Sequence, residues 1–331
     1  MKEMLIGKMN RIEEFILKGM RKAYQKLFLP SKELPPCEMD PDKASEMIYQ
    51  LLVSDEPCMV ARFGSTELSC LTNYMGIIDK SNSVWKYITG QTEQWWWNKN
   101  IANQMQQWSG FFPPTEENLT KFSELMLSDM RQVDLLGSWI PDEHKFDNYL
   151  QKVNFVRLTA MEPCWSKHPW SRVLEGKRVL VVHPFAEDIC RQYDNNRERL
   201  FDNPDVLPEF SSLRVIKAVQ SLGGEDNGFK NWFEALEWMK LEIDKEDYDI
   251  ALIGCGAYGF PLAAHVKRTG KKAVHLGGAL QLLFGIKGKR WENSGYNLLY
   301  NYTSLFNNYW VYPNKSTKPQ NAEEIEGGCY W

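Results

Sequence analysis

Short apolar runs alternate with amphipathic stretches along most of the chain, and this alternation predicts strands joined by helices. The runs have the length of strands, and their continuous apolar character is typical of strands buried on both faces. The expected strands are residues 58–63, 133–139, 154–158, 176–185, 213–219, 248–256 and 271–278. The expected helices are residues 43–54, 92–108, 115–130, 186–200, 231–246 and 260–270, with a further helix that Ser65 or Thr66 caps.

Repeated units of strand, loop and helix indicate an α/β fold, in which a Rossmann-like, mainly parallel sheet has helices on both faces. We expect this unit to occupy residues 37–312, with a helical insertion at about 81–131 and a C-terminal tail at 313–331. The insertion contains three consecutive tryptophans, Trp95 to Trp97. We expect them to pack within a helix, and stacking on a sugar ring is the alternative.

Residues 1–36 are predicted to form an N-terminal amphipathic helix and a proline-bearing linker. Basic residues occupy much of the helix surface outside the apolar positions. The apolar residues at helical spacing are Leu5, Met9, Ile12, Ile16, Met20, Tyr24 and Leu27. Two interpretations stay open. The helix docks on the body or on a second subunit of a homo-oligomer, or it lies on a membrane surface.

The charge balance limits the possible partners. A net charge of −4 supplies no general field that attracts phosphates, so we expect no nucleic acid. No apolar run approaches the roughly 18 to 20 residues of a membrane span. The seven cysteines are odd in number and include no CxxC pair, which favours reduced thiols. We therefore expect a cytoplasmic protein, either free or peripheral at the inner face of the membrane.

Candidate chemistry gathers where the expected strands end, because ligands of parallel α/β sheets bind beyond the carboxyl ends of the strands. The candidate catalytic residues are Glu67 and His183. The candidate ligand-binding residues are Arg62, Gly64, Ser65, Gly254, Gly256, Tyr258, Gly277, Gly278, Gln281 and Arg290.

The turn after the strand at 248–256 carries the strongest local signal. Gly254, Gly256 and Gly259 match the GxGxxG spacing, which lets a backbone approach a phosphate and places it at a helix N-terminus. The acidic residue that an NAD site has about 20 positions later is absent, and Lys271 and Lys272 stand there instead. The turn thus predicts an anionic ligand other than NAD, with a tight turn that binds no ligand as the alternative.

Arg62 and Glu67 flank the turn after the first strand. An arginine at the end of a buried strand needs an anionic partner, which is either a ligand such as a diphosphate or Glu67 itself. Glu67 suits a divalent cation or a general base. His183 is either catalytic or held by backbone hydrogen bonds, and Arg290 either covers a diphosphate or belongs to a solvated basic loop.

Several enzyme classes lack their motifs in this chain. The five histidines show neither HxH nor HExxH spacing, which argues against a histidine metal centre. A GxSxG elbow and a Walker lysine motif are also absent, which argues against serine hydrolases and P-loop NTPases.

The segments ARFGSTEL (61–68) and DIALIGCGAYGFPLAAHVKRTGKKAVHLGG (249–278) resemble the opening and closing parts of the GT-D-type glycosyltransferases. These enzymes act in bacterial surface-polysaccharide and adhesin-glycan pathways, and their first strand leads into an RFGDGE-like turn. The resemblance implies a nucleotide-sugar donor, with a UDP-sugar favoured, and a glycan or lipid-linked acceptor.

The resemblance also implies a metal-associated Asp-x-Glu motif. Glu67 matches its glutamate, whereas Ser65 replaces its aspartate. Either Glu67 holds Mn²⁺ or Mg²⁺ with a second acid, for which Glu162, Asp142 and Glu187 are candidates, or basic residues replace the metal. Two other functions stay open: a non-catalytic scaffold of a polysaccharide-synthesis complex, and a Rossmann-like methyltransferase that uses S-adenosylmethionine.

Overall fold

One parallel sheet forms the centre of the molecule in the computed structural model, which describes residues 11–30, 32–221, 227–293, 295–318 and 330–331. Within these residues its seven strands are in the order β3-β2-β1-β7-β6-β4-β5, and every neighbouring pair is parallel. The strands are β1 (Met59–Arg62), β2 (Leu135–Ser138), β3 (Asn154–Arg157), β4 (Arg178–His183), β5 (Ser212–Lys217), β6 (Ile250–Ile253) and β7 (Lys272–His275). The predicted Rossmann-like α/β fold is confirmed.

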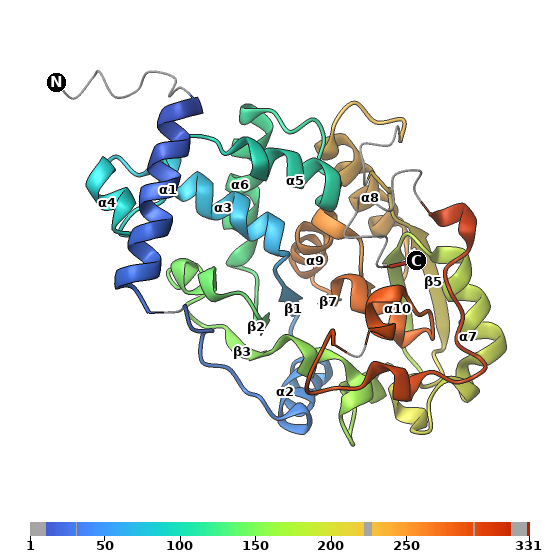
Figure 1. The fold of residues 1–331 in the computed structure, drawn as a ribbon. Coiled ribbons are helices and arrows are strands. Elements are labelled where there is room, and N and C mark those ends of the chain that lie inside the picture. Colours follow the sequence, from blue (N-terminus) through green and yellow to red (C-terminus); the bar gives the residue numbers. More distant parts are fainter. Residues whose placement is uncertain (1–10, 31, 222–226, 294, 319–329) are drawn as a thin grey trace.

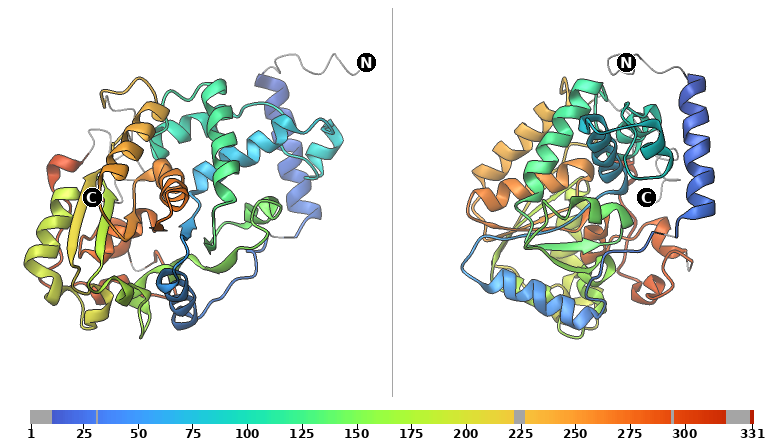
Figure 2. Two further views of the ribbon diagram at one scale, coloured as in Figure 1. Left: turned by 180° about the vertical axis from the view of Figure 1, so that it is seen from behind. Right: turned by 90° about the vertical axis from the view of Figure 1, so that its left-hand side faces the viewer.

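Helices cover both faces of this sheet (Figure 1). Helices α3, α5, α6, α8 and α9 contribute to the core on one face, and α2, α7, α10 and α11 contribute to the core on the other (Figure 2). The main helices are α1 (Arg11–Phe28), α2 (Pro41–Val53), α3 (Ser65–Ile78), α4 (Val84–Ile88), α5 (Lys99–Ser109), α6 (Glu116–Met130), α7 (Ala186–Leu200), α8 (Trp232–Lys245), α9 (Gly259–Arg268), α10 (Leu280–Leu283) and α11 (Lys289–Glu292).

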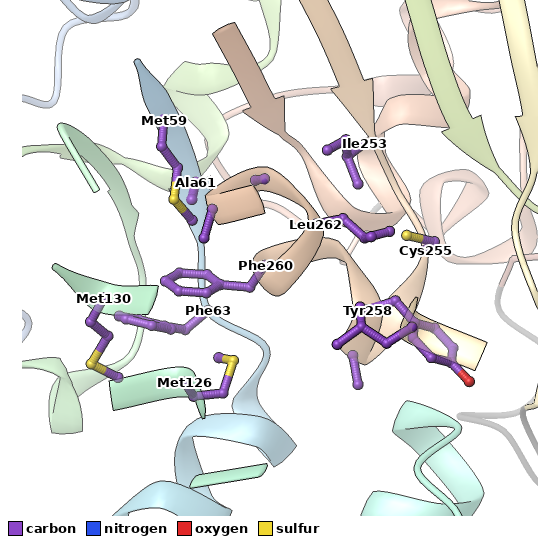
Figure 3. Close-up of a cluster of buried hydrophobic side chains, with 14 of the residues drawn as sticks. Met59, Ala61, Phe63, Met126, Met130, Ile253, Cys255, Tyr258, Phe260 and Leu262 are labelled. Carbon is purple, nitrogen blue, oxygen red and sulfur yellow. The ribbon is translucent and has the colours of Figure 1, made fainter. Parts of the chain in front are cut away.

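The strands are apolar at consecutive positions because their alternating side chains enter two different cores. In β4, Leu180 and Val182 belong to one core, while Val179 and Val181 belong to the other. At the end of β1, the ring of Phe63 stacks on Phe260 with centroids 4.9 Å apart (Figure 3). This contact ties the turn after β1 to helix α9.

The predicted helix at 92–108 is wrong over its first part, because α5 begins only at Lys99. Trp95 to Trp97 lie outside any helix. The side chain of Asn73 donates to the carbonyls of Gln94 and Trp96 and accepts from the backbone N–H of Asn98. These bonds hold the tryptophan run in a non-helical path, and its rings pack on Tyr74 and Tyr87.

The two ends of the chain are described in part. Residues 1–10 and 319–329 lie outside the described residues, and with them Leu5, Met9 and Cys329. The six other cysteines are free thiols, as expected. Among the described helices, none has both the length and the apolar character to cross a membrane.

An aromatic cluster joins the insertion helices to the glycine turn, and its central residue is the fully buried Trp232. Trp232 stacks on Tyr258 at 5.0 Å and contacts Phe111 and Phe122. We predict that Trp232→Ala lowers the free energy of unfolding by about 3 to 5 kcal/mol, because it leaves a large cavity. Trp238→Ala on the same helix, where Trp238 is 38% exposed, is the control and should cost less than about 1 kcal/mol in urea denaturation.

Candidate functional site

A cavity of about 160 Å³ opens beyond the carboxyl ends of β1, β4, β5, β6 and β7. It forms there because the loops after parallel strands all leave the same edge of the sheet. The structure brings every candidate site residue to this cavity. These residues are Arg62, Gly64, Ser65, Glu67, His183, Gly254, Gly256, Tyr258, Gly277, Gly278, Gln281 and Arg290.

Arg62 is a largely buried cation that faces the cavity. Its guanidinium lies 5.0 Å from the ring centroid of Trp139, and it makes no hydrogen bond or ion pair within the described part of the chain. Burial lowers the pKa of Arg62, while the electrostatic interactions with Tyr330 and Glu67 oppose that shift. A buried charge is costly without a hydrogen-bonded counterion, so this position favours an anion.

Arg290 is a second cation at the same cavity. It donates to the hydroxyl of Tyr330 at 3.1 Å, and its guanidinium lies 4.3 Å from the centroid of that ring. The charge of Arg290 also contributes to the lowered pKa of Arg62, which places the two cations within electrostatic range of each other. An anion bound to both removes this repulsion.

Glu67 lies in the first turn of α3 with 9% of its surface exposed. Gly64 is the N-cap of this helix and Ser65 its first residue, so the expectation that Ser65 or Thr66 caps it is wrong. A Cβ atom at Gly64 would lie 1.8 Å from Oε2 of Glu67. Because the backbone at Gly64 has ordinary angles, φ −76° and ψ 143°, this glycine serves to make room for the carboxylate.

The expected second acid is not present at the cavity. Among the described residues that line it, Glu67 has the only acidic side chain. Asp142 and Glu187 pair with lysines elsewhere, and Glu162 lines a separate cavity of about 10 Å³. The described part of the chain also contains no group of three metal-ligating side chains. The described residues at the cavity therefore supply too few oxygen ligands to hold Mn²⁺ or Mg²⁺ by themselves.

The glycines of the turns have structural reasons within the protein. A Cβ at Gly254 would lie 2.5 Å from the carbonyl oxygen of Gly277, and one at Gly259 would lie 2.2 Å from His275. Gly256 and Gly277 have φ of +57° and +60°, a region that glycine adopts readily. A Cβ at Gly278 would overlap Tyr330. The tight-turn alternative thus accounts for these glycines, which leave bare backbone along the cavity.

His183 and His275 are neutral hydrogen-bonding groups. Burial lowers the pKa of each to about 3, so both imidazole rings are uncharged near neutral pH. The backbone N–H of Phe185 donates to Nδ1 of His183 at 3.0 Å, which puts the proton of the neutral ring on Nε2. His275 has the opposite tautomer, since its Nδ1 lies 3.2 Å from the carbonyl oxygen of Ile253. His183 is therefore equipped to donate a hydrogen bond and not to act as a base.

Two amide side chains at the cavity have unsatisfied polar atoms. Oε1 of Gln281 and Nε2 of Gln220 are buried without a hydrogen-bond partner among the described residues. Buried polar atoms nearly always find partners, so one free acceptor and one free donor suit a polar ligand. The hydroxyl of Tyr258, in contrast, lies 3.1 Å from that of Ser221 and its ring stacks on Trp232. Tyr258 thus makes the contacts of a core residue.

Several aromatic residues that line the cavity were not among the predicted site residues: Trp108, Trp139, Phe185, Tyr330 and Trp331. Trp139 ends the expected strand at 133–139, so its place at a strand end was the available signal. Its Nε1–H donates to the carbonyl of Phe63 at 2.9 Å. Tyr330 and Trp331 belong to the expected tail and carried no such signal.

Comparisons with known proteins do not identify a family. No family model matches the chain, and no solved structure matches it. One curated protein, the calcium and calcium/calmodulin-dependent serine/threonine-protein kinase DMI-3 of Medicago truncatula, is 28% identical over 100 residues. This match covers 30% of the chain and 19% of the kinase, so it concerns a small part of that relative.

The contact between Gly64 and Glu67 can be tested by stability. We predict that Gly64→Ala lowers the free energy of unfolding by about 1 to 3 kcal/mol, because the new methyl group displaces the carboxylate. In a Glu67→Ala background the same substitution should cost clearly less. Gly19→Ala is the control, since a Cβ there meets nothing within 4 Å. Equal costs for Gly64→Ala in both backgrounds would contradict the assignment.

Proposed function

We propose that the protein is a glycosyltransferase that moves a sugar from a nucleoside-diphosphate donor, a UDP-sugar in the favoured case, to a glycan or lipid-linked acceptor. The observation that carries this proposal is Arg62, a largely buried cation with no anionic hydrogen-bond partner in the described chain, which faces the same cavity as Arg290. The role in surface-polysaccharide synthesis rests on the resemblance of residues 61–68 and 249–278 to GT-D-type enzymes.

In this proposal the two arginines bind the diphosphate. Negative charge grows on the departing diphosphate as the bond to the sugar breaks, and fixed cations in a partly dry cavity stabilise that charge. Neutral His183 donates its Nε2–H to a diphosphate oxygen. Oε1 of Gln281 accepts a hydrogen bond from the nucleotide sugar, and Nε2 of Gln220 donates one to it. The edge of the nucleotide base is a polar group that suits both.

Glu67 takes the role of the base. The acceptor hydroxyl forms a bond to the anomeric carbon, and its proton passes to the Glu67 carboxylate. The bond between the anomeric carbon and the diphosphate oxygen breaks, and its electron pair leaves with the nucleoside diphosphate. Arg62 favours the charged form of Glu67 before the transfer, since the two side chains attract each other.

We further propose that arginines, and not a metal held by the protein, supply most of the charge neutralisation. This follows from the single acidic side chain among the described cavity residues. A Mg²⁺ or Mn²⁺ ion that arrives with the diphosphate and gains Glu67 as one ligand is the alternative.

The two rival functions differ in what they bind. S-adenosylmethionine carries a sulfonium cation, which Arg62 and Arg290 disfavour, although its carboxylate is an anion that they can bind. A scaffold needs no nucleotide at all. A thermal-shift screen with UDP-, GDP-, CMP- and dTDP-sugars, with Mn²⁺ or with a chelator, separates them, because a ligand of the folded state raises the melting temperature. A shift with no donor, or with S-adenosylmethionine alone, would overturn the proposal.

We predict that Arg62→Ala weakens the affinity for the nucleotide sugar by at least about tenfold, since it removes charge-assisted hydrogen bonds to the diphosphate. The melting temperature should change little. Arg131→Ala is a matched control, because Arg131 lies 5.1 Å from the ring of Tyr149 much as Arg62 lies over Trp139, but outside the cavity lining. Titration calorimetry with the donor found in the screen measures the effect, and equal dissociation constants for wild type and Arg62→Ala would refute the assignment.

We predict that Glu67→Gln abolishes sugar transfer, by a factor of at least about 10², while the protein stays folded and still binds the donor. Glu162→Gln is the control, since Glu162 is 8% exposed, about as buried as Glu67, and does not line this cavity. Release of the nucleoside diphosphate reports transfer. Retained activity in Glu67→Gln would remove Glu67 from the reaction.

A further inference from the structure

Helix α1 lies at the periphery of the molecule, apart from the sheet (Figures 1 and 2). It docks on the segment around α4 through Arg21, which donates to the carbonyls of Tyr87 and Thr92 and pairs with Glu93 at 2.9 Å. Tyr24 packs edge-on against Trp85. The inner side of α1 is therefore a largely polar contact with the body, and apart from Tyr24 it leaves the described apolar positions of the amphipathic pattern exposed.

The apolar side of α1 faces outward. Phe15 is 80% exposed and Leu27 is 73% exposed. At 100° per residue the exposed apolar side chains fall on one stripe of the helix. This outer stripe consists of Ile12, Phe15, Ile16, Met20 and Leu27. Phe28, Leu29 and Trp85 of α4 are also exposed. Contiguous exposed apolar surface of this kind marks an interaction site.

The charge on one flank of the stripe is positive. Helix α1 contains five basic and two acidic residues, a net charge of +3, although the whole chain carries −4. Lys22 and Lys26 are exposed next to the stripe. Of the two acids, Glu14 lies 3.7 Å from Lys18. A second copy of the helix thus brings little negative charge to the lysines, whereas anionic lipid headgroups bring a great deal.

We propose that the outer stripe of α1 inserts into the headgroup region of an anionic bilayer, with Lys22 and Lys26 at the level of the lipid phosphates. The body of the protein then stays on the aqueous side, held through α4. This inference rests on α1 alone and does not depend on the proposed function. It gives the cavity a fixed relation to a membrane surface, which suits a lipid-linked acceptor.

The test is co-sedimentation of the full chain with vesicles of phosphatidylcholine mixed with phosphatidylglycerol, and with vesicles of phosphatidylcholine alone. We expect binding to the anionic vesicles, which weakens at high salt. Leu27→Glu should lower the partition coefficient at least about tenfold, since it places a charge in the stripe. Lys22→Glu should lower it as well. Leu241→Glu is the matched control, because Leu241 is a 60% exposed leucine on α8, and this variant should bind like wild type.

Three results would overturn the proposal. The first is no binding to anionic vesicles, and the second is equal binding of wild type and Leu27→Glu. The third is a dimer in light scattering that Leu27→Glu converts to a monomer without any vesicle effect, which would assign the stripe to a second copy of the chain. Because Leu27 and Leu241 are both exposed, neither variant should lose its folded circular dichroism spectrum.

Discussion

Parallel pairing of β1 with its two neighbours is the constraint on which the rest of the structure depends. β1 lies between β2 and β7, where Val60 is opposite both Leu135 and Val274. These backbone hydrogen bonds bring the turn that carries Arg62 and Glu67, from early in the chain, beside the turns that carry Gly254, Gly277 and Arg290, from late in the chain. A sheet in which β1 stood at an edge would leave the two groups apart, and Arg62 and Glu67 would not share a cavity with Arg290.

The electrostatics of the cavity follow from this placement. The strand carries Arg62 to a position where it loses water, and the protein compensates only in part. Trp139 provides a ring face, and Tyr330 and then Glu67 interact favourably with the charge. Glu143 is also close enough to interact with Arg62, but its carboxylate accepts hydrogen bonds from Ser138, Trp139 and Ile140. The cation therefore remains under-compensated, and this favours an anionic ligand.

The strands were predictable because both faces of the sheet are buried, which makes each strand a short apolar run. The position of the candidate site residues was predictable for a related reason. A strand end followed by a glycine is visible in the local sequence, and parallel strands place such ends at the same edge of the sheet. The path of Trp95 to Trp97 was not predictable, since it depends on hydrogen bonds from Asn73, which is distant in sequence. The outward direction of the apolar stripe on α1 was not predictable either, because periodicity shows that a helix has two sides but not which side contacts the body.

Tyr330 and Trp331 lie against the same cavity and have protein partners there. Tyr330 accepts from Arg290 and covers Gly278, and Trp331 packs on Phe185. A ligand that takes the place of these side chains competes with a group that is covalently tethered to the site. Its observed affinity is then the intrinsic affinity multiplied by the fraction of molecules in which the two aromatic residues are displaced. The occupancy of the cavity at a given ligand concentration is thus set partly by the chain itself.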